Sequence, residues 1–316
     1  MDRVNVGQTR SRPPLRNLAE FLLVSFVLKS LEWSPLPLAN RLARGYFRLL
    51  DLALPRLRNI AARNLAVALP ELSSEERRTI IRGVFHSIAR LAVTVAKFPS
   101  IQRENIGRWI RFEGYEHFEA ALRAGRGVLF ATAHLGNWEL SAYAHALCAA
   151  PMNVVVRPLD NPLLDRLVTR RRQLCGNRVI SKRDPVRPIL KALAANEAVG
   201  ILIDQNVSSE AVFVDFFGIP AAAASGFVRL AAHSGAAVIP GFALWCEPEG
   251  RYVLRFYPPV PITGDSLRDT QAIQTALESV IRVYPDQWLW IHRRWKTRPP
   301  GAPPLYEVAP ARSKTV

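Results

Sequence analysis

The sequence predicts an α/β protein with a mainly parallel central sheet flanked by helices, preceded by a helical N-terminal arm. Five apolar runs rich in Val, Ile, Leu and Phe are bounded by turn residues, as expected of strands buried on both faces. Helical stretches alternate with these runs at the interval typical of a parallel sheet. The first hundred residues carry helical patterns only. Together these features predict one α/β domain and one helical arm.

The boundaries follow from the same patterns. The expected strands are 127–133, 153–157, 198–204, 236–244 and 252–257, and the expected helices of the domain are 137–149, 162–174, 187–196 and 225–233. In the arm, a helix over 56–69 ends at Pro70. Ser73 and Glu76 form a capping box before a long helix that runs to about Ala96. We therefore expect an arm over 1–100, an α/β domain over 101–300 and a C-terminal tail over 301–316.

Composition narrows the classes of protein. The 316 residues are 49% hydrophobic and 22% charged, which excludes wholesale disorder and a coiled coil. The 42 Lys and Arg exceed the 26 Asp and Glu by 16, so a polyanionic partner is expected: nucleic acid, an anionic membrane face or a phosphorylated substrate. Three distant cysteines without ligand spacing support neither a disulfide framework nor a zinc site, and favour a reducing compartment.

The arm contains an apolar segment over residues 15–33. It is interrupted by Arg16, Glu20, Lys29 and Glu32, and its uncharged centre, Phe21 to Leu28, is too short to cross a hydrocarbon core of about 30 Å. Arginines flank it on both sides, which is typical of a helix that lies in the cytoplasmic leaflet. We expect peripheral, charge-assisted membrane attachment through this segment. The alternative is an ordinary core helix with a solvated basic end.

One predicted strand ends in residues that can transfer protons. His134 follows the strand 127–133, and Glu139 lies five residues later on the first turn of the next helix, with Gly136 permitting the turn between them. A carboxylate that accepts from Nδ1–H would fix the tautomer and leave Nε2 free to take a proton. The spacing alone is also compatible with a core histidine and a helix-initial acid favoured by the helix dipole.

Six sequence blocks occur in order from residue 134 to residue 299. They are His134 with Glu139, Val156-Arg-Pro-Leu-Asp-Asn-Pro162, Arg172 with Gly176, Gly200-Ile-Leu-Ile-Asp-Gln205, Phe216-Phe-Gly-Ile-Pro-Ala221 and Trp290-Ile-His-Arg-Arg-Trp-Lys-Thr-Arg-Pro299. In these blocks the chain resembles the bacterial lipid A biosynthesis acyltransferases, the secondary lauroyl and myristoyl transferases of the lysophospholipid acyltransferase superfamily. The chain departs from the family pattern after the Pro-Ala turn, where alanines replace a threonine and Ser225 is the nearest hydroxyl.

The resemblance implies a glycerolphosphate acyltransferase-like fold and a reaction. A fatty acyl chain would move from a thioester of acyl carrier protein or coenzyme A to a hydroxyl of a lipid A precursor, at the cytoplasmic face of the inner membrane. His134 would act as general base and Glu139 would orient it. Backbone N–H groups near Gly136 are the expected donors to the thioester oxygen. The family needs neither a metal nor a resident cofactor, so none is expected.

Further site residues are expected around this pair. Arginine suits bidentate contacts to oxyanions, so Arg157, Arg172 and Arg293 are candidate ligands for phosphates and acidic sugars, whereas Arg171 is expected to lie on the solvated cationic surface. Asp204 could orient an arginine or a substrate group, or cap the next loop. His292 is expected near the site, in a binding or a structural role. Trp288, Trp290 and Trp295 fit either a membrane interface or a core.

Two other functions stay open at this level. The first is acylation of a different glycolipid, such as a phosphatidylinositol mannoside. The second is a basic nucleic-acid-binding protein, which the charge of +16 would allow. No helix-turn-helix or RNP-like pattern is present, so we expect an anionic glycolipid, an acyl donor and a membrane surface as partners, and no nucleic acid.

Overall fold

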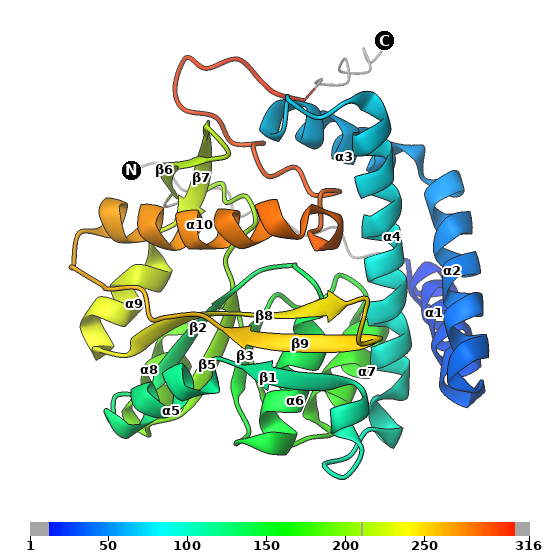
Figure 1. The fold of residues 1–316 in the computed structure, drawn as a ribbon, viewed down its shortest axis with the longest axis horizontal. Helices are drawn as coiled ribbons and strands as arrows, with labels where there is room; N and C mark the ends of the chain where they lie inside the picture. Colours follow the sequence, from blue (N-terminus) through cyan, green and yellow to red (C-terminus); the bar gives the residue numbers. More distant parts are fainter. Residues whose placement is uncertain (1–12, 210, 307–316) are drawn as a thin grey trace.

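The central sheet is seven-stranded and mostly parallel (Figure 1). The computed structural model describes residues 13–209 and 211–306. The strand order is β1-β9-β8-β2-β5-β3-β4, in which β8 and β9 form the single antiparallel pair. The bounds are β1 Ile110–Glu113, β2 Val128–Thr132, β3 Asn153–Val156, β4 Arg178–Ser181, β5 Ala198–Leu202, β8 Ala237–Cys246 and β9 Arg251–Phe256. The expected fold class and all five expected strands are confirmed.

Helices cover both faces of the sheet. Side chains alternate between faces along β2, as the pleat requires: Phe130 packs with α5 (Tyr115–Arg123) and α6 (Trp138–Cys148), whereas Leu129 faces α8 (Val186–Ala194) and α10 (Ser266–Val283). Helix α9 (Gly226–Ser234) packs beside α8 and α10, and α7 (Pro162–Gln173) lies against β4. The four helices expected in the domain are confirmed to within a few residues.

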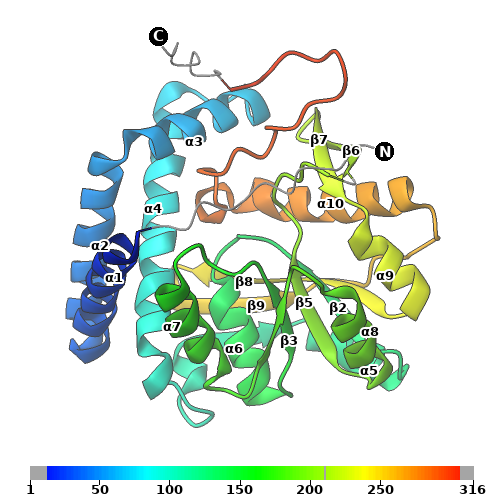
Figure 2. The ribbon, with the colours of Figure 1, turned by 180° about the vertical axis from the view of Figure 1, so that it is seen from behind.

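The arm consists of four helices: α1 (Pro14–Trp33), α2 (Leu36–Ala53), α3 (Pro55–Ala68) and α4 (Ser74–Lys97). The expected capping box starts α4, because Ser73 Oγ accepts from Glu76 N–H and the Glu76 carboxylate accepts from Ser73 N–H. Figures 1 and 2 show α4 upright along the side of the sheet, with α1 and α2 on its outer side. Leu65 and Phe85 share a core with the strands, so the arm and the domain pack as one body.

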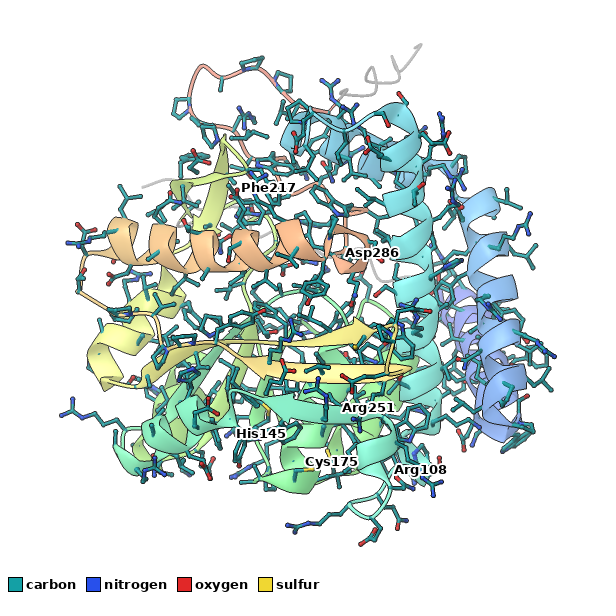
Figure 3. The ribbon with its side chains drawn as sticks, viewed as in Figure 1. Arg108, His145, Cys175, Phe217, Arg251 and Asp286 are labelled. Atoms are coloured by element: carbon teal, nitrogen blue, oxygen red, sulfur yellow. The ribbon has the colours of Figure 1, made fainter. Side chains whose placement is uncertain are left out.

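Two edge strands and one hairpin were not predicted, because they carry charged or small residues in place of apolar runs. Strands β1 and β4 are the two edges of the sheet, and they carry charged residues because one side of an edge strand meets solvent. The hairpin β6 (Ala211–Phe216) and β7 (Ile219–Ala224) is alanine-rich. Its turn places Phe217 and Gly218 at φ of 59° and 73°, as a two-residue hairpin turn requires. Figure 3 shows Phe217 beside this hairpin, on the far side of α10 from the sheet.

Of the charges that interrupt the apolar segment of α1, the two acidic ones contact the rest of the protein, whereas Arg16 and Lys29 are exposed. Glu32 forms a 2.6 Å ion pair with the buried Arg171, whose guanidinium also donates to two backbone carbonyls of α4. Glu20 accepts from Asn161 at the start of α7. Leu28 and Leu31 are buried against α4. Arg171, which was expected on the solvated surface, is instead buried and structural, and Leu28, which was expected to contact the membrane, belongs to the protein core.

The opposite side of α1 and α2 is apolar and exposed. The exposed large side chains there are Leu15, Leu18, Leu22, Leu23, Phe26, Trp33, Leu36, Leu38, Leu49, Leu50 and Leu52, and they make up most of the exposed large hydrophobic residues of the described chain. We call this set the apolar face of the arm. Among the described residues, one helical stretch, Ser74–Ser100, is long and apolar enough to span a membrane, and half of it is buried inside the protein, as a core helix would be.

The start of the predicted C-terminal tail packs onto the arm. The Tyr306 hydroxyl donates to Asn64 Oδ1 at 2.6 Å, and Arg63 donates to the Leu305 carbonyl. Asn64 in turn donates to the carbonyls of Trp290 and His292. Residues 307–316 of the expected tail lie outside the described residues.

Candidate active site

A buried aspartate holds His134 at the carboxyl ends of two neighbouring strands. Asp204 Oδ1 lies 2.9 Å from His134 Nδ1, and Oδ2 accepts from the His134 backbone N–H at 3.0 Å and from Trp288 Nε1 at 2.8 Å. The pairing of β2 with β5 brings the two residues together, since it continues past the strands through Ile203 N–H to the Thr132 carbonyl. This is the edge at which open α/β sheets bind their ligands.

Asp204 is ionised throughout the neutral range. Burial raises the pKa of its carboxyl, but the charge of His134 and the hydrogen bonds from His134 and Trp288 outweigh burial and hold this pKa at about 2. A carboxylate opposite Nδ1 keeps the proton on that nitrogen. His134 Nε2 is consequently left as the nitrogen that can accept a proton.

The expected contact between Glu139 and His134 is not formed. The Glu139 carboxylate takes two hydrogen bonds from Arg172 on α7, one of them 2.8 Å from Nε to Oε2. Trp138, the residue before Glu139, packs against His134 instead, with its ring centroid 5.0 Å from that of His134. Burial lowers the pKa of Arg172, but Glu139 outweighs it, so the net shift is upward. The prediction that Glu139 orients His134 is corrected: that geometry belongs to Asp204.

The backbone donors expected near Gly136 are already engaged. Gly136 N–H donates to the Gln287 carbonyl at 2.9 Å, and Asn137 N–H donates to the Ala243 carbonyl at 2.8 Å. Gly136 itself is required by the turn, because its φ is 63° and a Cβ would lie 2.0 Å from the Ala243 oxygen. The turn closes against β8 and gives no free donor from these two residues.

The other expected site residues fall into two groups. His292 lies next to the pair: its Nε2 accepts from Asn206 N–H at 3.1 Å, and burial lowers its pKa to about 4, so it is neutral. Arg157 is at the end of β3, exposed and paired with Asp160. Ser225 is buried before α9, and the Arg293 guanidinium lies over the Tyr306 ring. Within residues 13–209 and 211–306, neither Ser225 nor Arg293 has a hydrogen bond to His134 or Asp204.

The two tryptophans of the closing block, and Trp288 just before it, are core residues. Trp288, Trp290 and Trp295 are all at most 2% exposed, and Trp288 supports Asp204 directly. Arg294, between them, is fully buried and donates to the Ala222 carbonyl and to Gln274. The membrane-interface alternative for this block is therefore wrong.

The sequence reasoning missed Gln205. Its Nε2 lies 3.4 Å from His134 Nε2, so it sits beside the nitrogen that Asp204 leaves free. The block 200–205 pointed to this strand end, but nothing in the sequence distinguished the glutamine from an ordinary loop residue.

A small apolar cavity of about 60 Å³ lies on the α6 side of the sheet, beside these groups. Strands β2, β3 and β5 and helices α6 and α7 contribute its walls, which include Phe130, Val154, Leu202 and Ala142. Trp138 lines the cavity and also contacts His134, and the Glu139–Arg172 pair borders it. Figure 3 shows His145, another wall residue, on this side of the sheet.

Metal ligands are not grouped in the part of the chain that the structure describes: no three His, Cys, Asp or Glu side chains gather there. The described site thus offers acid–base groups and an apolar cavity. That the reaction needs neither metal nor cofactor stays a prediction.

The fold and the site together define the class: an α/β protein in which a histidine at the strand ends is fixed by a buried carboxylate, next to an apolar cavity. Comparison with known proteins identifies it further. The family described as "Bacterial lipid A biosynthesis acyltransferase" matches residues 8–297, and the chain belongs to this family. It is an acyltransferase, and the resemblance found in the sequence is confirmed.

Several curated relatives cover most of the chain. The "Lipid A biosynthesis lauroyltransferase" of Escherichia coli K12 is 32% identical over 277 residues, 86% of this chain and 90% of the relative. The "Lipid A biosynthesis palmitoleoyltransferase" of the same organism is 31% identical over 265 residues, 80% and 83% of the two chains. The "Phosphatidylinositol mannoside acyltransferase" of Mycolicibacterium smegmatis is 27% identical over 238 residues, 74% and 78%.

We expect the Glu139–Arg172 pair to act as one unit. Glu139→Ala and Arg172→Ala should each lower kcat/KM by less than the loss of His134 does, and the double variant should be little worse than either single variant. Glu139→Asp should keep partial activity. Steady-state kinetics of the wild type, the two single alanine variants and the double variant forms a double-mutant cycle. If Glu139→Ala is as damaging as loss of His134 and its effect adds to that of Arg172→Ala, the two residues are not one unit.

Two buried histidines should make the fold sensitive to acid. Burial lowers the pKa of His145 and of His292 from the ordinary 6.5 to about 4. Between pH 6.5 and pH 4 the unfolded chain binds more protons than the folded one. The contribution of these histidines to the free energy of unfolding is therefore complete above pH 6.5 and is lost as the pH falls to 4. The loss is at most about 1.4 kcal/mol per pH unit for each histidine. Denaturant unfolding at pH 7, 6 and 5 measures this slope. His145→Gln should reduce it by one histidine's share; an unchanged slope would contradict the assignment.

Proposed function

We propose that the chain transfers a fatty acyl group from an acyl thioester to a hydroxyl of a lipid A precursor, with His134 as general base. The observation that carries the proposal is the pairing of His134 Nδ1 with the buried Asp204, which leaves Nε2 free next to an apolar cavity. The family match and the lauroyltransferase and palmitoleoyltransferase relatives support the reaction and the substrate class.

The proposed step uses one proton. His134 Nε2 takes the proton of the acceptor hydroxyl while its oxygen attacks the thioester carbon. The imidazolium that forms is stabilised by the Asp204 carboxylate. The carbon–sulfur bond then breaks, and His134 returns the proton to the leaving sulfur, so that an ester and a thiol result. General-base catalysis of this kind contributes roughly 100- to 10,000-fold.

The cavity is the proposed site of the acyl chain. Its walls are mostly aliphatic and aromatic, with Glu139 and Arg172 among its polar lining residues. Trp138 lines the cavity and also contacts His134, so an acyl chain bound there would lie close to the proposed base. Burying methylene groups releases about 0.8 kcal/mol each, which would favour binding of the acyl chain of a donor carried by acyl carrier protein or coenzyme A.

The acceptor is proposed to be an anionic glycolipid. The chain carries a net charge of +16. Arg157 is exposed and follows the carboxyl end of β3, just as His134 follows the carboxyl end of β2. Arginine at this position can exchange Asp160 for a phosphate or an acidic sugar. Among the described residues, Ser225 and Arg293 form no hydrogen bond with His134, so the proposed acceptor site does not include them.

A phosphatidylinositol mannoside is the second candidate acceptor, because relatives named for it are 27% identical to this chain. The test that separates the two is mass spectrometry of lipid extracts after deletion of the gene and complementation with the wild type or with His134→Ala. Loss of one acyl chain from lipid A, restored only by the wild type, is expected. Loss from another glycolipid would favour the second candidate, and no change in either would contradict the proposed function.

We propose that the apolar face of the arm attaches the enzyme to the cytoplasmic side of the inner membrane. The face extends over α1 and α2, while the two acidic residues of α1, Glu20 and Glu32, are used in contacts with α7 and its N-cap. Arg41, Arg44 and Arg48 on α2 would add attraction to anionic headgroups, about 1 kcal/mol each near the surface.

Removing the apolar face should release the protein from membranes. Leu22, Leu23 and Phe26 are 58–66% exposed, and full burial of such side chains contributes roughly 1.5–3 kcal/mol each. Replacing all three by serine should therefore weaken binding to anionic liposomes by at least about 100-fold in a sedimentation assay. The matched control replaces Leu174, Leu267 and Val283, which are exposed elsewhere, by serine. Equal binding of the two triple variants would refute attachment through the arm.

A further inference from the structure

We propose that Gln205 is a further catalytic residue, whose side-chain amide donates a hydrogen bond to the thioester oxygen as that oxygen gains negative charge. The inference rests on the proposed acyl transfer, since it assigns the group that stabilises the charge formed in that reaction. In acyl transfer the attack on the carbonyl creates an oxyanion, and fixed donors aimed at it lower the barrier.

Several neighbouring donors are already engaged in hydrogen bonds within the protein. Gly136 and Asn137 N–H groups are bound by the carbonyls of Gln287 and Ala243, and the Arg172 guanidinium is paired with Glu139. Trp288 Nε1 is bound by Asp204. Each of these donors would have to break a protein hydrogen bond to reach a substrate oxygen.

The Gln205 amide is placed where the reacting atoms must lie. Its Nε2 is 3.4 Å from His134 Nε2, the nitrogen proposed to take the hydroxyl proton. The contact is long for a hydrogen bond, and among the described residues it is the one hydrogen bond that this side chain makes. An acceptor hydroxyl bound to His134 Nε2 would displace it, and the freed amide would then be within one side-chain rotation of the thioester oxygen.

Hydrogen bonds hold the residues on both sides of Gln205. The backbone from which the Gln205 side chain starts therefore has a defined position. Asp204 is bound to His134 and Trp288. Asn206 N–H donates to His292, and the Asn206 side chain exchanges two hydrogen bonds with Thr297, at 2.9 and 3.0 Å. The neutral His292 and the closing sequence block thus serve to hold this loop. Preorganised donors of this kind cost little reorganisation during the reaction.

A neutral donor also suits the electrostatics of the site. Asp204 is a buried anion beside His134, so a cation at position 205 would compete with His134 for it, whereas an amide leaves that pair intact. A carboxylate at 205 would instead repel the oxyanion and stabilise the protonated imidazole. The substitution Gln205→Glu therefore separates donation from mere space filling, because the two side chains have nearly the same shape.

The test is steady-state kinetics of purified, full-length Gln205→Ala, Gln205→Glu and wild-type protein, with an acyl thioester and a lipid A precursor as substrates. Removal of one oxyanion donor typically lowers kcat by about 100- to 1,000-fold, so this loss is expected in both variants, with the two KM values little changed. In Gln205→Glu the acid limb of the kcat/KM profile should also move to higher pH, because the added carboxylate favours imidazolium.

Controls distinguish the possible failures. Gln173→Ala removes an exposed carboxamide at the end of α7 and should leave kcat unchanged. Melting temperatures within a few degrees of the wild type show that the variants are folded. A kcat for Gln205→Glu within about threefold of the wild type, or a loss confined to KM, would overturn the role of Gln205. If His134→Ala also transfers at the wild-type rate, the proposed function itself fails; if His134→Ala is inactive, only the Gln205 assignment does.

Discussion

His134→Ala should abolish acyl transfer while leaving the fold intact. The imidazole is the proposed base, and its loss should lower kcat by roughly 100- to 10,000-fold. The fold should survive because the side chain lies at a strand end and is 18% exposed rather than packed in the core. The measurement is transfer of a labelled acyl group from a thioester to a lipid A precursor, together with the melting temperature of the variant.

His233→Ala is the matched control for this variant, since His233 is an exposed histidine on α9, away from the site. It should transfer at the wild-type rate. Transfer by His134→Ala at a near wild-type rate would end the proposed mechanism, provided that both proteins melt at the same temperature.

Asp204→Asn should be nearly as damaging as the loss of His134. An amide at this position no longer forces the proton onto Nδ1, and it cannot stabilise the imidazolium. In a serine protease triad the equivalent change costs about 10,000-fold in kcat. We expect a loss of at least about 100-fold here, with KM little affected. Kinetics over pH 5–9 is the measurement, because Asp204, with a pKa of about 2, does not titrate in that range.

In Asp204→Asn, an NH₂ group takes the place of one carboxylate oxygen, so a donor that now binds that oxygen would lose its acceptor. Oδ2 of Asp204 now accepts from both His134 N–H and Trp288 Nε1, and a buried donor left unpaired costs about 1–3 kcal/mol. Asp204→Asn should therefore lower the free energy of unfolding by about that amount. A stable variant with full activity would show that the carboxylate has no part in orienting the base.

The buried strands could be predicted from the sequence because their apolar runs leave little ambiguity. The edge strands β1 and β4 could not, since half of their side chains meet solvent and resemble those of loops. The charges of α1 predicted a helix that lies on the membrane surface, whereas Glu32 pairs with Arg171, a partner 139 residues away. Sequence spacing cannot reveal such pairs.

The same limit explains the correction at the site. Glu139 is five residues from His134 and was the natural partner by spacing, but the turn at Gly136 closes onto β8 and Glu139 instead pairs with Arg172. Asp204 is 70 residues from His134 and reaches it because β5 lies next to β2. The apolar run that ends at Asp204 was visible in the sequence. The strand order that makes it the partner was not.

The most direct test of the central claim, that the Asp204–His134 pair is the base in acyl transfer, compares two isosteric variants side by side. Asp204→Asn and Glu139→Gln remove the two candidate carboxylates with the same change in shape and charge. Transfer from an acyl thioester to a lipid A precursor is measured with each, under identical conditions. We predict that kcat of Asp204→Asn falls at least about 100-fold, and at least tenfold below that of Glu139→Gln. A lower kcat for Glu139→Gln than for Asp204→Asn would contradict the assignment of Asp204.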